Sequence, residues 1–134
     1  MNQSESRRQP RGGDSQDRKP RVLLIVDDDP RICRMITRRL ESSFDGLHTA
    51  NTPADAEHKL EKETITHVIC DFHLGEGAPK GTDLIAKWRS QYPSIERVVL
   101  FTSTYLDDKV KPAGEDAIIH KTTDFNQLME ALDS

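Results

Sequence analysis

The sequence predicts an α/β fold in which a parallel β-sheet is covered by helices on both of its faces. Short apolar runs rich in branched side chains recur along the chain, and Val22–Val26 and His67–Cys70 are the clearest of them. Such continuous runs are typical of strands buried on both faces. Segments with the apolar spacing of amphipathic helices separate the runs, and this alternation indicates parallel strands joined by right-handed crossovers.

Capping residues and prolines delimit the first three expected helices. Asp29 is expected to be the N-cap of the first helix, with Pro30 at its first turn, because a short acidic side chain accepts backbone amide hydrogens and proline is favoured there. The second helix is expected to begin at Thr52-Pro53. The third carries Trp88, which is expected in the core, and ends before Pro93.

The remaining elements complete five alternations of strand and helix. The fourth helix, between Leu106 and Gly114, is expected to be short or irregular, because Pro112 disfavours the helical conformation of the residue before it. Asp124 is expected to cap the last helix. The five strands are expected at Val22–Val26, Leu47–Ala50, His67–Cys70, Val98–Phe101 and Ala117–His120, and His48, His58 and His67 at the surface or at strand edges.

Composition divides the 134 residues into a tail and a domain. Residues 1–20 are rich in Ser, Gln, Arg, Gly and Pro, and Met1 is their only strongly apolar residue. Such a segment is expected to be a disordered tail, and residues 21–134 a single domain. The formal net charge is −4 although the tail is net basic, so the domain is acidic. This balance argues against direct binding of nucleic acid or of anionic membranes.

Cysteine usage and hydropathy predict a soluble, cytoplasmic protein. Cys33 and Cys70 lack the spacing of a metal site and are expected to be free, buried thiols in a reducing compartment. No apolar run reaches the roughly 20 residues that span a bilayer. The N-terminus contains arginines but lacks the apolar segment of a secretory signal.

Polar residues stand directly after four of the predicted strands. They are Asp27 and Asp28 after the first, Asp71 after the third, Thr102 and Ser103 after the fourth, and Lys121 after the fifth. Because the carboxyl ends of parallel strands meet at one edge, where ligands of open α/β folds bind, these groups are expected to converge.

Three converging carboxylates need a neutralising partner. Two unit charges about 4 Å apart repel by roughly 4 kcal/mol at an effective dielectric constant near 20. Either one carboxyl group keeps a proton, or a divalent cation binds, and a set of oxygen donors without His or Cys favours Mg²⁺. A lysine and a hydroxyl group facing a Mg²⁺-bound carboxylate suit a phosphoryl group, and a carboxylate can itself become an aspartyl phosphate.

With these residues in place, the chain from about residue 21 to residue 134 resembles the receiver domain of the response regulators of two-component signalling. The matching motifs are Leu-Leu-Ile-Val-Asp27-Asp28-Asp29-Pro30, Val-Ile-Cys-Asp71, Val-Val-Leu-Phe-Thr102-Ser103 and Ile118-Ile119-His120-Lys121. The resemblance implies a flavodoxin-like fold whose five parallel strands have the order 2-1-3-4-5.

The resemblance also implies the chemistry at the sheet edge. Asp71 would accept a phosphoryl group from a phosphohistidine of a sensor histidine kinase or a histidine-phosphotransfer protein. Mg²⁺ would bind to Asp28, Asp71 and the backbone carbonyl of His73, and Asp27 would hold a metal-bound water molecule. The later loss of the phosphoryl group is slow self-processing, so the domain is not expected to be an enzyme.

Two further residues would convert phosphorylation into a signal. Thr102 would be the switch hydroxyl, and Lys121 would bind the phosphoryl group. Phosphorylation would shift a partner-binding face between two existing conformations. The expected output is a protein partner of unknown identity, and the chain is expected to act as a stand-alone module because no output domain fits in its remaining length.

Departures from the family pattern surround this switch. Thr122 follows Lys121 where the family has a proline, so a trans peptide bond or a rebuilt loop is expected. Ile118 takes the place of the family's switch aromatic residue and is expected in the core, with Tyr105 or His120 as possible substitutes. The segment before Lys121 is short, and the loop at residues 72–81 is longer than in most members of the family.

Two other functions stay open at this point. A pseudo-receiver, disabled by Thr122 and Ile118, would bind a partner without being phosphorylated. A phosphohydrolase of the haloacid-dehalogenase type would use the Asp-x-Asp start at Asp27, although Arg31 stands where that motif has Thr or Val and the chain is short. A phosphoryl label on Asp71 would indicate a receiver, and a label on Asp27 would indicate the hydrolase.

Overall fold

The computed structural model describes residues 19–103, 114–121 and 125–133. The expected disordered tail, apart from its last two residues, and Tyr105, Thr122 and Asp124 lie outside these ranges, as does nearly all of the expected fourth helix. Five parallel strands form the sheet: β1 (Val22–Val26), β2 (Gly46–Ala50), β3 (His67–Cys70), β4 (Arg97–Thr102) and β5 (Ala117–His120). Their order, β2-β1-β3-β4-β5, confirms the α/β class and the strand order that the resemblance implies.

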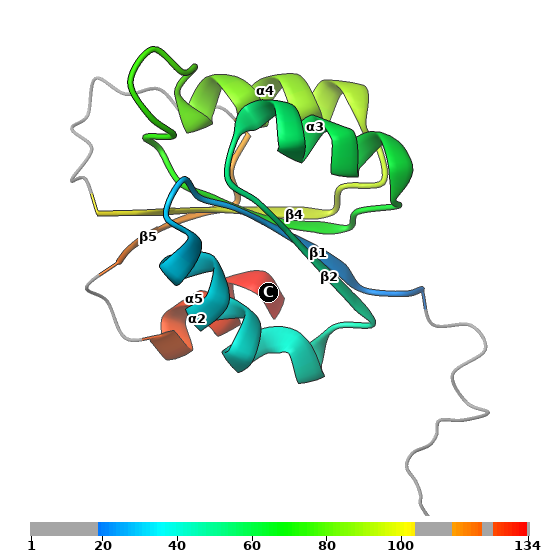
Figure 1. Ribbon diagram of the computed structural model, residues 1–134. Helices are drawn as coiled ribbons and strands as arrows, with labels where there is room; N and C mark the ends of the chain where they lie inside the picture. The colour runs from blue at the N-terminus through cyan, green and yellow to red at the C-terminus, as the bar shows by residue number, and fades with distance from the viewer. Residues whose placement is uncertain (1–18, 104–113, 122–124, 134) are drawn as a thin grey trace, which may run out of the picture.

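Helices cover both faces of the sheet (Figure 1). Helices α2 (Pro30–Leu40) and α5 (Phe125–Asp133) lie on one face, and α3 (Pro53–Lys62) and α4 (Gly81–Gln91) lie on the other. A single 3₁₀ turn, η2 (Glu41–Ser43), extends α2. None of the helices in the described ranges is long and apolar enough to cross a bilayer.

Side-chain caps start the first two of these helices where the sequence predicts them. The Asp29 side chain accepts a hydrogen bond from the Arg31 backbone amide at 2.9 Å, and Pro30 occupies the first turn of α2. Thr52 caps α3 in the same way through the Asp55 amide. Asp27 and Asp28 lie between the end of β1 and the capped start of α2 at Pro30, so this acidic pair stands at the carboxyl end of β1.

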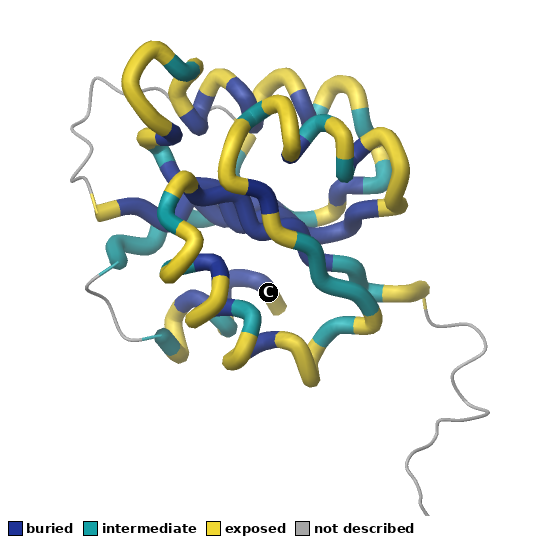
Figure 2. Tube along the Cα trace, viewed as in Figure 1, coloured by how far each residue is buried: buried dark blue, intermediate teal, exposed yellow. Residues whose placement is uncertain are grey.

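The sheet separates two apolar cores, and its central strands are the most buried part of the molecule (Figure 2). Trp88 is 1% exposed in the core beneath α3 and α4, as the sequence predicts. Its indole Nε1 donates a hydrogen bond to Glu57 at 3.1 Å, and the same carboxylate accepts one from Lys87. Trp88 therefore joins α4 to α3 by a polar contact as well as by apolar packing.

One core assignment is wrong, because Ile118 is 52% exposed. Ile118 lies opposite Leu100 in the parallel register, so it faces the side of the sheet that α4 covers. β5 is, however, an edge strand, and none of its four residues is fully buried. The exposure of Ile118 is thus determined by its position on an edge strand and not by its apolar side chain.

His67, expected at the surface or at a strand edge, is the first residue of β3 and is only 7% exposed. The Nδ1 atom lies 2.7 Å from the Thr66 hydroxyl group, and the ring packs edge-on against Phe44. The Arg21 guanidinium lies over the Phe44 ring, 4.4 Å from its centroid. Burial, together with the charge of Arg21, lowers the pKa of His67 below its ordinary value of 6.5.

We expect this lowered pKa to weaken the fold in acid. Below about pH 6.5 the imidazole of His67 binds a proton more readily in the unfolded chain than in the folded one. The unfolded state therefore binds more protons, and the free energy of unfolding decreases as the pH is lowered. His67→Gln removes this contribution. Urea unfolding between pH 7 and pH 5 should show a shallower loss of stability in His67→Gln than in the wild type. Replacing the exposed His58 by Gln is the control and should leave the slope unchanged.

Candidate functional site

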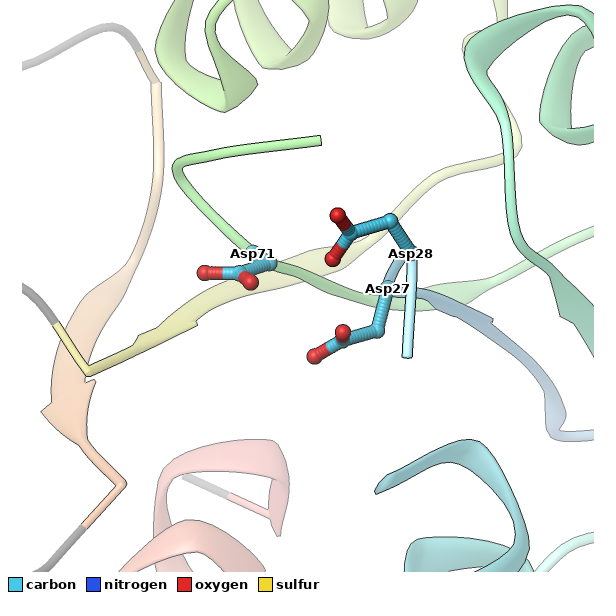
Figure 3. A group of neighbouring side chains, drawn as sticks. All are labelled: Asp27, Asp28 and Asp71. Carbon is cyan, nitrogen blue, oxygen red and sulfur yellow. The ribbon is translucent and has the colours of Figure 1, made fainter. Parts of the chain in front are cut away.

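Three carboxylates gather at the carboxyl ends of β1 and β3 (Figure 3). These two strands are neighbours with Val26 opposite Cys70, so the residues that follow them, Asp27 and Asp71, lie side by side. Carboxylate oxygens of Asp27, Asp28 and Asp71 all lie within 4.8 Å of one another. Asp27 and Asp71 are buried, whereas Asp28 is exposed at the mouth of the cluster.

Lys121 bridges the two buried carboxylates from the end of β5. Its Nζ atom lies 2.7 Å from Asp27 Oδ2 and 3.1 Å from Asp71 Oδ2. The Lys121 backbone amide donates to the Thr102 carbonyl at 2.8 Å, which ties the end of β5 to the end of β4. Thr102 itself is 1% exposed. The structure thus brings the predicted lysine, the predicted hydroxyl residue and the three predicted carboxylates to one edge of the sheet.

Burial and neighbouring charges shift the pKa values of this cluster in opposite directions. Burial raises the pKa of Asp27, although the hydrogen bonds from Lys121 and from the Asp29 amide favour its charged form. Burial also disfavours the Lys121 ammonium group, but the hydrogen bonds and charges of Asp27 and Asp71 raise its pKa overall. Lys121 therefore stays charged at neutral pH and compensates part of the negative charge.

The charge that remains matches a divalent cation. Three carboxylates face one ammonium group, so the fully ionised cluster has an excess of two negative charges. All candidate donors are oxygens, which are the ligands of hard cations such as Mg²⁺. The donor set therefore fits Mg²⁺, with exposed Asp28 on the side from which an ion can enter.

The loop after Asp71 turns back to pack against that residue. The Phe72 amide donates to Asp71 Oδ1 at 2.7 Å, and Gly75 and Gly77 adopt positive φ angles of 116° and 80°. His73, the expected carbonyl donor, is exposed, and its Nδ1 atom lies 3.3 Å from Lys80 Nζ. The loop thereby holds one oxygen of the buried Asp71 carboxylate through the Phe72 amide.

Gly81 supports the site in a way that sequence reasoning missed. Its amide donates to the Phe72 carbonyl at 2.8 Å, and a Cβ atom at this position would lie 2.1 Å from the Asp71 carbonyl oxygen. Only a residue without a side chain allows α4 to start this close to the strand. The glycines of this loop are visible in the sequence, but the contact that requires Gly81 is not.

Two other residues hold the backbone of Asp27. The Asn51 side-chain amide donates to the Asp27 carbonyl at 2.8 Å and lies 3.6 Å from Cys33 Sγ. The Cys33 thiol also contacts the Asp27 carbonyl, and burial raises its pKa to about 11. Cys33 and Cys70 are both free and buried, as expected. Asn51 follows β2 at the same sheet edge, which is the signal that identifies it.

Comparison with known proteins agrees with this arrangement. The family model described as the response regulator receiver domain matches residues 23–133. The chain belongs to this family. As a receiver domain it is a signalling module of two-component systems.

Individual relatives show how the receiver domain compares with longer proteins. It is 29% identical over 117 residues to the transcriptional regulatory protein GlrR of Escherichia coli, covering 86% of this chain and 26% of that protein. It is 33% identical over 108 residues to the alginate biosynthesis transcriptional regulatory protein AlgB of Pseudomonas putida, covering 78% of this chain and 23% of that protein. The chain thus spans about a quarter of the length of these relatives.

A solved structure shows the same fold. The CheY-like response regulator receiver domain protein of Methanospirillum hungatei superposes with a TM-score of 0.74 at 26% identity. The match covers 86% of this chain and 92% of that one. The receiver domain described here therefore agrees with that protein over nearly its full length.

Proposed function

We propose that the chain is a phospho-accepting receiver in which Asp71 takes a phosphoryl group from a phosphohistidine. The observation that carries this proposal is the position of Lys121, whose ammonium group bridges Asp71 and Asp27 at the carboxyl end of the sheet. A buried carboxylate beside a fixed cation is suited to act as a nucleophile toward a phosphoryl group and to hold the product. The donor is a sensor histidine kinase or a histidine-phosphotransfer protein.

Each residue of the site has a separate role in the proposed phosphoryl transfer. One carboxylate oxygen of Asp71 forms a bond to phosphorus while the bond between phosphorus and the donor's imidazole nitrogen breaks. Lys121 neutralises negative charge on the transferred group, for which it is already placed at 3.1 Å from Asp71. Thr102, at the end of β4, donates a hydrogen bond from its hydroxyl group to a phosphoryl oxygen. Its position thereby links phosphorylation of Asp71 to the conformation of the end of β4.

Asp28, Asp71 and the carbonyl of His73 are the proposed Mg²⁺ ligands, with Asp27 holding a metal-bound water molecule. The ion would supply positive charge for the transferring phosphoryl oxygens. Asp28 is suited to this role because it is exposed beside the two buried carboxylates. Asp27 stays paired with Lys121, which keeps the ammonium group within reach of Asp71.

Intact-mass spectrometry after incubation with acetyl phosphate tests the proposal. We expect a gain of one phosphoryl group that requires Mg²⁺, is abolished by EDTA and is absent from Asp71→Asn. Asp27→Asn is the comparison for the nucleophile: because Asp27 pairs with Lys121, we expect this variant to label more slowly than the wild type, but its intact Asp71 carboxylate should still be labelled. Peptide mapping of the labelled wild type should place the label on Asp71.

Failure of labelling would have a defined meaning. If neither acetyl phosphate nor a phosphorylated histidine-phosphotransfer protein labels the wild type in Mg²⁺, the phospho-acceptor function is wrong and the chain is a binding module independent of phosphorylation. A label on Asp27 would instead assign the nucleophile to the other buried carboxylate. A downstream protein partner that binds only the labelled form would support the proposed conformational switch.

A further inference from the structure

A basic cavity that is open to solvent lies between α2 and the edge strand β2, next to the acidic cluster. Its volume is about 540 Å³, within the range of roughly 300–1,000 Å³ that is typical of small-molecule sites. Its lining includes two arginines, two threonines and Asn51. The lining residues are Pro30, Cys33, Arg34, Thr37, Arg38, Leu47, Thr49 and Asn51.

The two arginines carry the argument for an anionic ligand. Arg34 and Arg38 are separated by one helical turn, so their side chains lie on the same side of α2. Within the described residues neither of them has an ion pair or a hydrogen bond, whereas Arg31 pairs with Asp29 and Arg39 stacks on Phe125. Two exposed guanidinium groups without a counter-charge among the described residues, in an otherwise acidic chain, suit a ligand with two negative charges.

The chemistry of the arginines and of the other lining residues indicates which class of anion the cavity would bind. Arginine binds phosphate oxygens through two parallel hydrogen bonds, and a phosphate monoester has a dianionic group that two arginines can share. The Thr49 hydroxyl group is exposed and makes no hydrogen bond within the described part of the chain, so it can donate one to the same group. Pro30 and Leu47 offer apolar surface for the organic part of the ligand.

We propose that the cavity between α2 and β2 binds a small phosphate monoester through Arg34 and Arg38. Two of its lining residues, Asn51 and Cys33, contact the Asp27 carbonyl, at 2.8 Å and 3.7 Å. A ligand in the cavity therefore touches the same side chains that hold the acidic cluster in place. This site is separate from Asp71 and does not depend on the proposed phosphorylation.

Amide chemical-shift titration without Mg²⁺ tests the site. In EDTA the acidic cluster has excess negative charge and repels anions, so binding there is suppressed. The probes are inorganic phosphate, adenosine 5′-monophosphate and, as a dicarboxylate, succinate. We expect saturable shifts at the amides of Cys33, Thr49 and Asn51 with the monophosphate, and weaker binding of succinate.

Two double variants of α2 distinguish specific binding in the cavity from a general effect of the positive charge of the helix. Arg34→Gln with Arg38→Gln is expected to weaken monophosphate binding by about tenfold or more, because charge-assisted hydrogen bonds are lost. Arg31→Gln with Arg39→Gln removes the same charge from α2 outside the cavity and should change binding by less than about threefold. A dispersed amide spectrum of both variants confirms that they are folded.

Three results would overturn the proposal. The first is the absence of saturable binding of inorganic phosphate and of the monophosphate up to about 10 mM, a concentration that would detect a site with a binding free energy of only about −3 kcal/mol. The second is an equal loss of binding in the two double variants, and the third is binding of succinate as tight as that of the monophosphate. Because no phosphodonor or Mg²⁺ is present, none of these results bears on the phosphorylation of Asp71.

Discussion

Replacing Lys121 by methionine is expected to lower the free energy of unfolding by about 3 kcal/mol in EDTA, since removing one partner of a buried ion pair leaves uncompensated charge. Asp27 and Asp71 would then face each other with no cation between them, although both are buried. Mg²⁺ should restore part of the loss, because the ion compensates the same charge. Urea unfolding with and without Mg²⁺ measures both effects.

Lys87→Met provides the matched control for this variant. Lys87 also pairs with a carboxylate, Glu57, at 2.9 Å, but its side chain is 52% exposed. Exposed pairs contribute between 0 and about 1 kcal/mol, so the control should lose much less stability and gain nothing specific from Mg²⁺. Equal losses in the two variants, or a Lys121→Met defect that Mg²⁺ does not reduce, would show that Lys121 is not the counter-charge of the cluster.

Alanine at position 81 is expected to damage both stability and phosphorylation. Its Cβ atom would have to occupy space 2.1 Å from the Asp71 carbonyl oxygen, and because that neighbour is backbone, either α4 or the end of β3 has to shift. We expect a loss of about 2–4 kcal/mol, typical of severe overpacking, and a large fall in the rate of labelling by acetyl phosphate. Urea unfolding and timed intact-mass measurements test the two effects separately.

Gly46→Ala is the appropriate comparison for Gly81→Ala. At position 46 the nearest atom to a new Cβ is a Val22 side-chain carbon at 3.4 Å, which is an ordinary contact. This control should therefore label at the wild-type rate and stay close to the wild-type stability. A Gly81→Ala protein with normal stability and normal labelling would contradict the close contact between α4 and the end of β3.

The strand ends explain why so much of the fold and of the acidic cluster can be predicted. In a parallel sheet the residue after each strand is carried to the same edge, so apolar runs that end at Asp27, Asp71 and Lys121 already bring these side chains together. The contribution of Gly81 could not be predicted in this way. It depends on how closely the start of α4 approaches the end of β3, and the conformation of the loop between them sets that distance.

The positions that differ from expectation share a different cause. Ile118 and His67 have side chains whose type predicts the opposite environment from the one they occupy. Ile118 is exposed on β5, which is at the sheet edge, and His67 is buried where its ring packs against Phe44. Such environments are set by neighbours that are contributed by other elements, and local sequence patterns do not contain that information.

The position of Trp88 determines what fluorescence can reveal about cooperativity in this protein. The chain has a single tryptophan, and it is buried in the core on the α3 and α4 side of the sheet. Its emission therefore reports the loss of that core alone, while far-ultraviolet circular dichroism averages over the helices on both faces. Coincident transitions by the two methods would mean that both cores melt as one unit, and an earlier dichroism transition would mean that α2 and α5 unfold first.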